Sequence, residues 1–235
     1  EVRAGKMSKD KFQRAESSMI RSRGHCNTMG TASTMGIMAE VLGMTIPGIA
    51  GTPAADSRLL QASQETGRLI VKMVHDDLKP SQIMVRASFI NAIVALAATG
   101  GSTNAIVHLL AIAGRLGVPL KLEDFDKHGS NIPLLVNLLP AGKHLMEDLY
   151  RAGGLLAVLK EVADLLDSSA ITVTGKSLTD YLSDAEIYDE SVISRRKAPL
   201  QENAGIVVLR GNLAPNGAVI KPAAATKELL KHRGP

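Results

Sequence analysis

The sequence predicts an α/β chain in which residues 1–183 are rich in helices with buried strands, and the residues from 205 onward are rich in strands. Three observations predict this fold class. Apolar residues recur at helical spacing along most of the first region, short apolar runs interrupt that spacing, and two strand-like runs follow residue 205. Because hydrophobic residues make up 45% and charged residues 21% of the 235 residues, a largely disordered chain is excluded.

Helical spacing and capping residues predict helices over residues 1–23, 31–42, 54–74, 86–98, 104–113, 122–128, 144–151 and 155–166. The helix over 31–42 ends at Gly43, which suits a left-handed C-cap. Thr52 and Pro53 stand in the N-cap and first-turn positions of the helix over 54–74. These residues therefore mark where two of the helices end or begin.

The helix over 86–98 is almost wholly apolar after Ser88, so we expect it to be buried on most sides. Gly100 and Gly101 end it, and Ser102 or Thr103 caps the helix that follows. The remaining elements are a short buried strand over 134–138, a strand over 171–174, a helical turn over 178–182, and strands over 206–210 and 218–221 joined by a turn at 215–217.

Residues 184–204 carry almost no periodicity and are predicted to be a linker. The domains are therefore residues 1–183, the linker, and the start of a second, β-rich domain at 205–235. The chain begins without an initiator methionine, and we expect it to be an internal excerpt of a longer protein.

Composition excludes several classes of protein. The 27 Lys and Arg residues outnumber the 23 Asp and Glu residues only slightly. The basic residues near the N-terminus are interrupted by acidic residues, and few aromatic residues lie among them. Nucleic acid is therefore not an expected partner. No apolar run approaches the roughly 18 residues of a membrane span. The lone Cys26 cannot form an intramolecular disulfide, which favours a reducing, cytoplasmic location.

Cys26 is the residue most able to carry chemistry. It lies in the segment Gly24–Met35, just ahead of the helix that begins near Thr31, where free amides and the helix dipole favour a thiolate. A thiolate there is a nucleophile or a ligand of a soft metal. The alternative is that Cys26 is a small buried hydrophobic residue, which is the commoner role of a lone cysteine. His25 is adjacent in sequence and is a weaker candidate for supporting the thiol.

The segment from Gly100 to His108 is the second candidate. Its Gly-Gly turn and helix-end amides suit a carboxylate, so Ser102, Thr103 and Asn104 are candidate substrate-binding residues. His108 follows Asn104 at i+4, and either lines a pocket with it or is a hydrogen-bonded histidine of the core.

The segments Gly24–Met35, Gly43–Gly48, Gly100–His108, Asn137–Gly142 and Gly205–Pro222 resemble, in order, those of the dihydroxy-acid and sugar-acid dehydratases. The form Cys-Asn-Thr-Met-Gly-Thr-Ala-Ser-Thr-Met after Cys26 is more similar to the sugar-acid (aldonate) branch than to the branched-chain amino-acid branch. This resemblance covers nearly the whole chain and implies that its second domain is β-barrel-like.

The resemblance further implies a hydro-lyase that converts a 2,3-dihydroxy carboxylic acid, here a sugar acid, into a 2-keto-3-deoxy acid. Cys26 aligns with the last of three cysteines that hold the family's iron–sulfur cluster, with [2Fe–2S] favoured over [4Fe–4S]. The other cysteines, the Mg²⁺ ligands and the serine base would lie outside this chain. The family also implies a small-molecule substrate and a homodimer or a dimer of dimers.

Three alternatives remain open. The first is a dihydroxy-acid dehydratase of branched-chain amino-acid biosynthesis. The second is a thiol-dependent enzyme with Cys26 as nucleophile and a basic partner such as His25. The third is a helical interaction module without catalysis.

Overall fold

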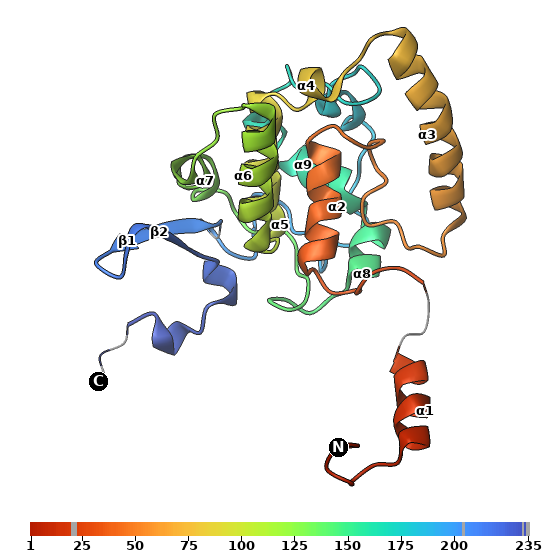
Figure 1. Cartoon of the computed structure of the whole chain (residues 1–235). Helices are drawn as coiled ribbons and strands as arrows, with labels where there is room; N and C mark the ends of the chain where they lie inside the picture. The colour runs from red at the N-terminus through yellow and green to blue at the C-terminus, as the bar shows by residue number, and fades with distance from the viewer. Residues whose placement is uncertain (20–22, 204, 232, 234–235) are drawn as a thin grey trace.

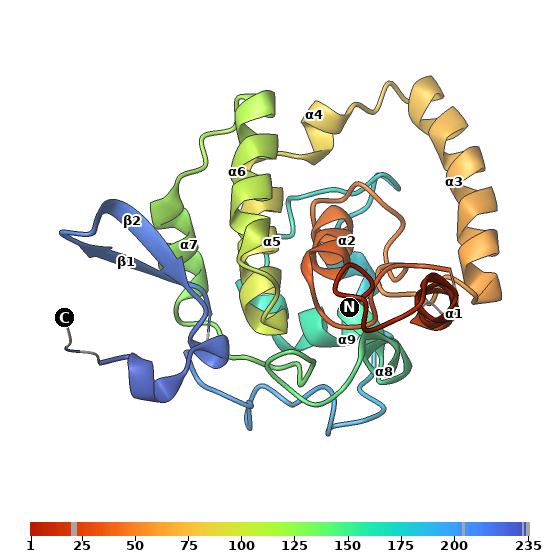
Figure 2. The same cartoon turned by 60° about the horizontal axis from the view of Figure 1, so that its bottom comes forward.

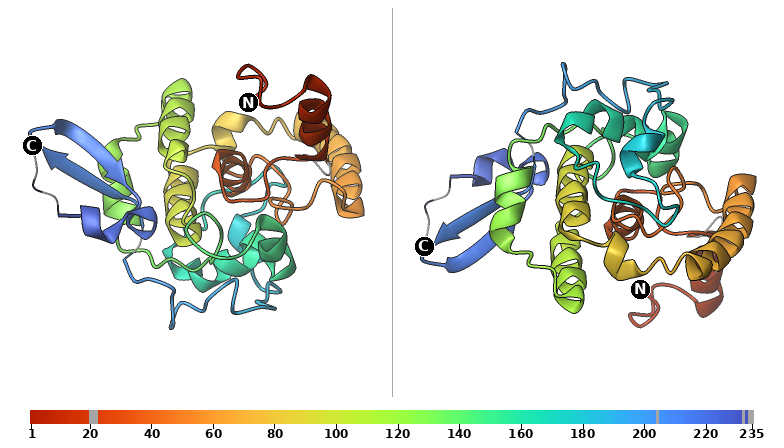
Figure 3. Two further views of the ribbon diagram at one scale, coloured as in Figure 1. Left: turned by 90° about the horizontal axis from the view of Figure 1, so that it is seen from below. Right: turned by 90° about the horizontal axis from the view of Figure 1, so that it is seen from above.

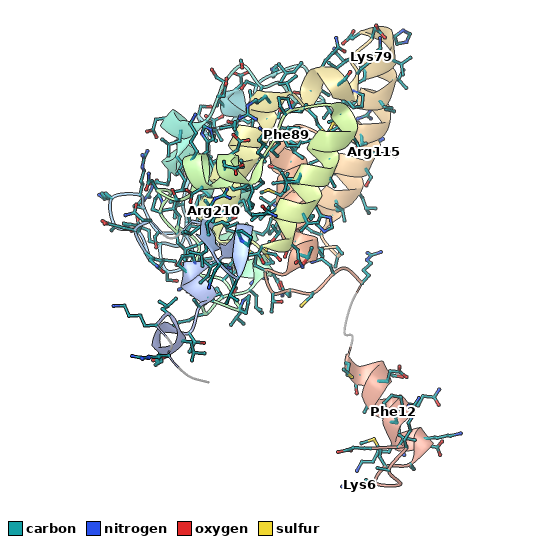
Figure 4. The ribbon with its side chains drawn as sticks, turned by 60° about the vertical axis from the view of Figure 1, so that its left-hand side comes forward. Lys6, Phe12, Lys79, Phe89, Arg115 and Arg210 are labelled. Atoms are coloured by element: carbon teal, nitrogen blue, oxygen red, sulfur yellow. The ribbon has the colours of Figure 1, made fainter. Side chains whose placement is uncertain are left out.

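Helix α5 (Arg86–Thr99) is the centre of the fold (Figure 1). The computed structural model describes residues 1–19, 23–203, 205–231 and 233. Of the 14 residues of α5, 11 are buried, including Phe89, which Figure 4 shows in the interior. The predicted burial of this segment is confirmed, because its apolar side chains face neighbours in every direction.

Four helices pack directly against α5: α2 (Thr31–Val41), α6 (Asn104–Leu116), α7 (Leu122–Gly129) and α9 (Gly154–Glu161). Gly100 and Gly117 end α5 and α6 in the left-handed conformation. Gly43, predicted as a left-handed cap, has φ +82° directly after the last turn of α2. Across the described ranges, no helix is long and apolar enough to span a membrane.

The smaller helical elements complete the body. They are α4 (Pro80–Ile83), α8 (Met146–Arg151), and the 3₁₀ turns η1 (Ala163–Leu165), η2 (Leu178–Tyr181), η3 (Pro222–Ala224) and η4 (Lys227–Leu229). The predicted helix over 155–166 becomes α9 followed by η1, and the predicted turn over 178–182 corresponds to η2. Helix α4 was not predicted, since four residues are too few to show a helical period.

Two helices lie at the edge of the molecule (Figures 1 and 2). Helix α1 (Lys9–Met19) has no buried residue and stands apart from the body, and residues 20–22 of its predicted range lie outside the described residues. Helix α3 (Ser57–His75) has one buried residue, Met73, and leaves Leu60 and Val74 exposed.

The predicted start of α3 at residue 54 is wrong, because the cap is Asp56 rather than Thr52. The Asp56 carboxylate accepts a hydrogen bond of 2.9 Å from the Arg58 amide, which satisfies one of the free N–H groups of the first turn. Thr52, Asp56 and Ser57 are all residue types that cap helices, and the sequence alone does not reveal which of them is used.

The strands predicted over 134–138 and 171–174 are also wrong in detail. Each forms isolated bridges instead of a sheet, such as Val136 with Ile193 and Ile171 with Ser177. The apolar side chains of residues 134–136 are buried as expected. Burial selects the same residue types whether or not a neighbouring strand provides a ladder, so the pattern predicted the burial and not the pairing.

The two-stranded antiparallel sheet is formed by β1 (Val207–Gly211) and β2 (Ala214–Ile220), in register with Val208 opposite Val219. Its turn lies at residues 212–213, so the turn predicted at 215–217 is wrong and those residues belong to β2. The hairpin packs on α7, where Arg210, labelled in Figure 4, pairs with Glu123. The α/β class with a helix-rich first part is confirmed (Figure 3).

Residues 184–203 have little regular structure but follow the surface of the helical body. Val192 and Ile193 are buried, and the Asn137 amide donates to the carbonyl of Val192 at 2.9 Å. Arg195 contacts Glu161 at the end of α9 at 3.2 Å. The segment is therefore fixed against the helices over much of its length.

Candidate functional site

Cys26 lies in the exposed loop that precedes α2. Its Sγ atom is 3.0 Å from the Thr28 hydroxyl. Hydrogen bonds from the Thr28 side chain and amide lower the pKa of the Cys26 thiol, because both stabilise the thiolate. The thiol is exposed, so the interpretation of Cys26 as a buried hydrophobic residue is wrong.

The loop around Cys26 is fixed by segments distant in sequence. The carbonyl of Asn27 accepts a hydrogen bond of 2.8 Å from the Met146 amide, and its side-chain oxygen accepts one of 3.0 Å from the Glu147 amide. The Met29 amide donates to the carbonyl of Leu139 at 2.9 Å. Contacts to the start of α8 and to residue 139 therefore hold the part of the loop that follows the thiol.

The segment that follows Gly100 meets the first turn of α2. The Asn104 side-chain nitrogen donates to the Thr31 hydroxyl at 2.8 Å, and the Ser102 amide donates to the Thr34 hydroxyl at 3.0 Å. The structure thus brings together the two segments that the sequence singled out, although about 70 residues separate them.

The remaining predicted candidates have different surroundings. Ser102 Oγ accepts a long hydrogen bond of 3.3 Å from the Asn104 amide, and the N-cap Thr103 makes no side-chain capping bond. His108 is exposed on α6, so it is not a core histidine. The His25 Nδ1 atom is 2.8 Å from the carbonyl oxygen of Cys26, and so interacts with the backbone of that residue.

A hollow of about 450 Å³ lies beside the Cys26 loop. Its lining comes from three parts of the chain: residues 23–25 and Asn27, the loop 45–54, and Gly36 and Ala39 of α2. Glu147 at the start of α8 also lines it, whereas Cys26 itself does not.

Sequence reasoning missed two charged residues next to these segments. Glu40 on α2 is fully buried, and burial raises the pKa of its carboxyl to about 7. Lys221 is half-buried, burial lowers the pKa of its amine, and its Nζ atom donates to the carbonyl of Gly100. The signal for Glu40 was present, since it is a lone carboxylate between Ile37 and Val41 on the apolar face of the helix.

Cys26 fits one ligand position of an iron–sulfur cluster, because its thiol is exposed and its pKa is depressed. A complete ligand set is not found within the part of the chain that the structure describes, where no group of three His, Cys, Asp or Glu side chains lies close enough to hold a metal ion. Any cluster held by Cys26 therefore needs ligands from elsewhere.

Comparison with known proteins identifies the family. Residues 1–181 match the model of the N-terminal region of dihydroxy-acid/6-phosphogluconate dehydratases, and residues 191–235 match that of their C-terminal region. The chain belongs to this family. The family resemblance predicted from the motifs is confirmed.

Individual relatives within the dehydratase family are similar over nearly the whole chain. The L-arabinonate dehydratase of Rhizobium leguminosarum bv. trifolii is 54% identical over 99% of this chain and 41% of its own length. The L-arabonate dehydratase of Azospirillum brasilense is 52% identical over 99% of this chain and 40% of its own length. The dihydroxy-acid dehydratase of Thermodesulfovibrio yellowstonii is 44% identical over 90% of this chain and 38% of its own length. The chain thus spans about two fifths of the length of these relatives.

Proposed function

We propose that this chain is part of a hydro-lyase that removes water from a 2,3-dihydroxy sugar acid and yields a 2-keto-3-deoxy acid. The observation that carries the proposal is the exposed Cys26 thiol, whose pKa is lowered and which lies in a fixed loop of a dehydratase-family chain. The L-arabinonate and L-arabonate dehydratases are 54% and 52% identical to this chain, and the dihydroxy-acid dehydratase is 44% identical. This difference favours a sugar acid over a branched-chain dihydroxy acid.

In this proposal Cys26 is one thiolate ligand of an iron–sulfur cluster, [2Fe–2S] in preference to [4Fe–4S], and Mg²⁺ is the second cofactor. When bound, the cluster supplies a Lewis acid for the hydroxyl group that leaves. The contribution of this chain is to lower the pKa of the thiol through Thr28 and to fix the loop that carries it through Asn27 and Met29. The serine base and the Mg²⁺ ligands belong to parts of the enzyme outside this chain.

Ser102, Thr103 and Asn104 are the proposed contacts to the substrate. Their segment is fixed against the first turn of α2, which follows the Cys26 loop directly. Ser102 and Thr103 are half-buried and Asn104 is exposed, so hydroxyl and amide groups remain within reach of a polyol. Their role is to orient the hydroxyl groups of the sugar acid.

A thiol nucleophile is less well supported by the geometry. A nucleophilic cysteine needs a base within hydrogen-bonding distance of its sulfur. Within the described ranges, the side chain hydrogen-bonded to the Cys26 Sγ atom is that of Thr28, while the His25 ring contacts the Cys26 carbonyl.

We also propose a cytoplasmic location, which a free exposed thiol favours, and a homodimer or dimer of dimers, which the family resemblance favours.

The test is an anaerobic activity screen of the full-length enzyme that contains this chain. A panel of aldonates and branched-chain dihydroxy acids is offered in the presence of Mg²⁺, and formation of 2-keto acid is measured. We expect turnover of one or more aldonates, with lower kcat/KM for the branched-chain acids. Turnover restricted to the branched-chain acids would contradict the substrate class, and no 2-keto acid from either group would contradict the proposed reaction.

A further inference from the structure

Glu40 is a buried carboxylate for which the proposed reaction has no direct use. It lies in the last turn of α2 and is 0% exposed. One carboxylate oxygen accepts a hydrogen bond of 2.7 Å from the Gly48 amide, and the other accepts one of 2.6 Å from the Ala50 amide. Burial of a carboxylate costs several kcal/mol unless it is well satisfied, so these two bonds are what makes the position tolerable.

The two amides belong to the loop that forms one wall of the hollow beside Cys26. Gly48 and Gly51 have φ angles of +88° and +83°, a conformation that other residues rarely adopt. The loop has no strand or helix of its own between Met44 and Asp56. The buried Glu40 side chain therefore accepts hydrogen bonds from loop amides that, in a helix or strand, would bond to backbone carbonyls.

The same loop touches the segment that carries Cys26. A Cβ atom placed on Gly24 would lie 3.0 Å from the Cβ atom of Ala54, so the Ala54 side chain lies close to the Gly24 backbone. Gly24 lies two residues before Cys26, and Ala54 lies four residues after Ala50. A chain of contacts therefore runs from the Glu40 carboxylate through the loop to the residues before the thiol.

We infer that Glu40 is a positioning residue for Cys26, and that it acts through the loop 48–54, whose contact with Gly24 fixes the segment before the thiol. The inference rests on the proposed function in so far as Cys26 is a cluster ligand. It adds a residue that supports the ligand from 14 positions further along the chain. Preorganised support of this kind keeps a ligand in one geometry.

The first test is hydrogen–deuterium exchange of the full-length enzyme with Glu40→Gln. Glutamine has nearly the same shape but can accept only one of the two amide hydrogen bonds. Loss of one such bond weakens the loop by about 1 kcal/mol, which corresponds to about fivefold faster exchange. We expect this acceleration in peptides covering residues 46–52 and 24–30.

The matched control is Asn91→Ala. Asn91 is equally buried and also holds a loop, since its side chain donates to the Asp167 carbonyl at 3.0 Å and accepts from the Asp167 amide at 2.7 Å. It should leave exchange of residues 24–30 at the wild-type rate. Acceleration confined to residues 46–52 in Glu40→Gln, or equal acceleration of 24–30 in the control, would overturn the inference.

A second variant tests the inference independently, in case Glu40→Gln does not fold. Ala54→Gly removes the contact to Gly24 and leaves the buried carboxylate intact. It should accelerate exchange of residues 24–30 while residues 46–50 keep their wild-type rate. Unchanged exchange at 24–30 would overturn the inference even if Glu40→Gln cannot be folded.

The functional readout is the visible iron–sulfur absorption of the full-length enzyme. We expect lower absorption per chain in Glu40→Gln and wild-type absorption in Asn91→Ala, because only the first affects the segment before Cys26. Equal loss in both variants would overturn the positioning role. A wild-type enzyme without iron–sulfur absorption would contradict the proposed function instead, and the exchange experiment would still decide the role of Glu40.

Discussion

At the scale of single residues, Cys26 gives the most direct prediction. In the full-length enzyme, Cys26→Ser should abolish iron–sulfur absorption and dehydratase activity together, because a hydroxyl group is a poor ligand of iron compared with a thiolate. Cys26 lies in an exposed loop outside the helices, so the helix content should stay at its wild-type value. Absorption spectroscopy, circular dichroism and the 2-keto acid assay measure the three quantities. Retained absorption with turnover would show that Cys26 is not a ligand.

Glu40 gives a prediction about pH. Its folded-state pKa is raised from 4.5 to about 7 by burial, so the folded chain binds a proton more tightly than the unfolded chain. This contribution to stability is fully present below pH 4.5 and is lost as the pH rises to about 7, a change of about 3 kcal/mol in the free energy of unfolding. Urea denaturation at several pH values should show this loss in the wild-type chain and not in Glu40→Gln.

The control for this pH dependence is again Asn91→Ala, which removes buried hydrogen bonds without removing a titratable group. The Asn91→Ala variant should have a lower free energy of unfolding at every pH, and this free energy should change with pH as steeply as in the wild type. If the free energy of unfolding changes with pH equally in the wild-type chain and in Glu40→Gln, the buried carboxyl does not titrate between pH 4.5 and about 7.

At the scale of elements, the turn after α5 gives a prediction about backbone conformation. Gly100 has φ +62°, and a Cβ atom there would lie 2.5 Å from the Leu134 side chain. Gly100→Val should lower the free energy of unfolding by about 2 kcal/mol or more, from strain and overpacking together. Gly114→Val, on α6 with open space around it, should have little effect. Equal stabilities in a urea titration would contradict the turn assignment.

The elements also show how far the sequence could be interpreted. Helices α2, α5 and α6 were predicted closely, because a long apolar period and a following glycine define both the face and the end of a helix. The bridges of residues 134 and 136 could not be predicted, because their partners, Gln201 and Ile193, lie more than 50 residues away. Local patterns contain no information about such partners.

The same distinction holds for the candidate site. Cys26 and Asn104 were found from their segments, because a thiol before a helix and a Gly-Gly turn are local features. The contact of Asn104 with Thr31, and the contacts of Glu40 with the loop at 48–50, depend on how the chain returns on itself. Sequence patterns selected the candidate residues for chemistry and missed the residues that hold those candidates in place.

At the scale of the whole molecule, the number of metal ligands gives a prediction. Expressed alone, the 235-residue chain should bind no stable iron–sulfur cluster and show no dehydratase activity. It has one cysteine, and its described residues include no cluster of three potential ligands. Anaerobic reconstitution with iron and sulfide, followed by absorption spectroscopy and the 2-keto acid assay, measures both. A stable cluster at one chain per cluster, or any turnover, would contradict the proposed ligand assignment.

The contacts around Cys26 also set an order of events during synthesis. Asn27 is held by the amides of Met146 and Glu147, about 120 residues further along the chain. A ribosome releases the N-terminal part first, so the thiol emerges long before the residues that fix its loop. The surroundings of Cys26 are completed only after Glu147 has left the exit tunnel, and iron delivered earlier would meet a thiol that is not yet held in place.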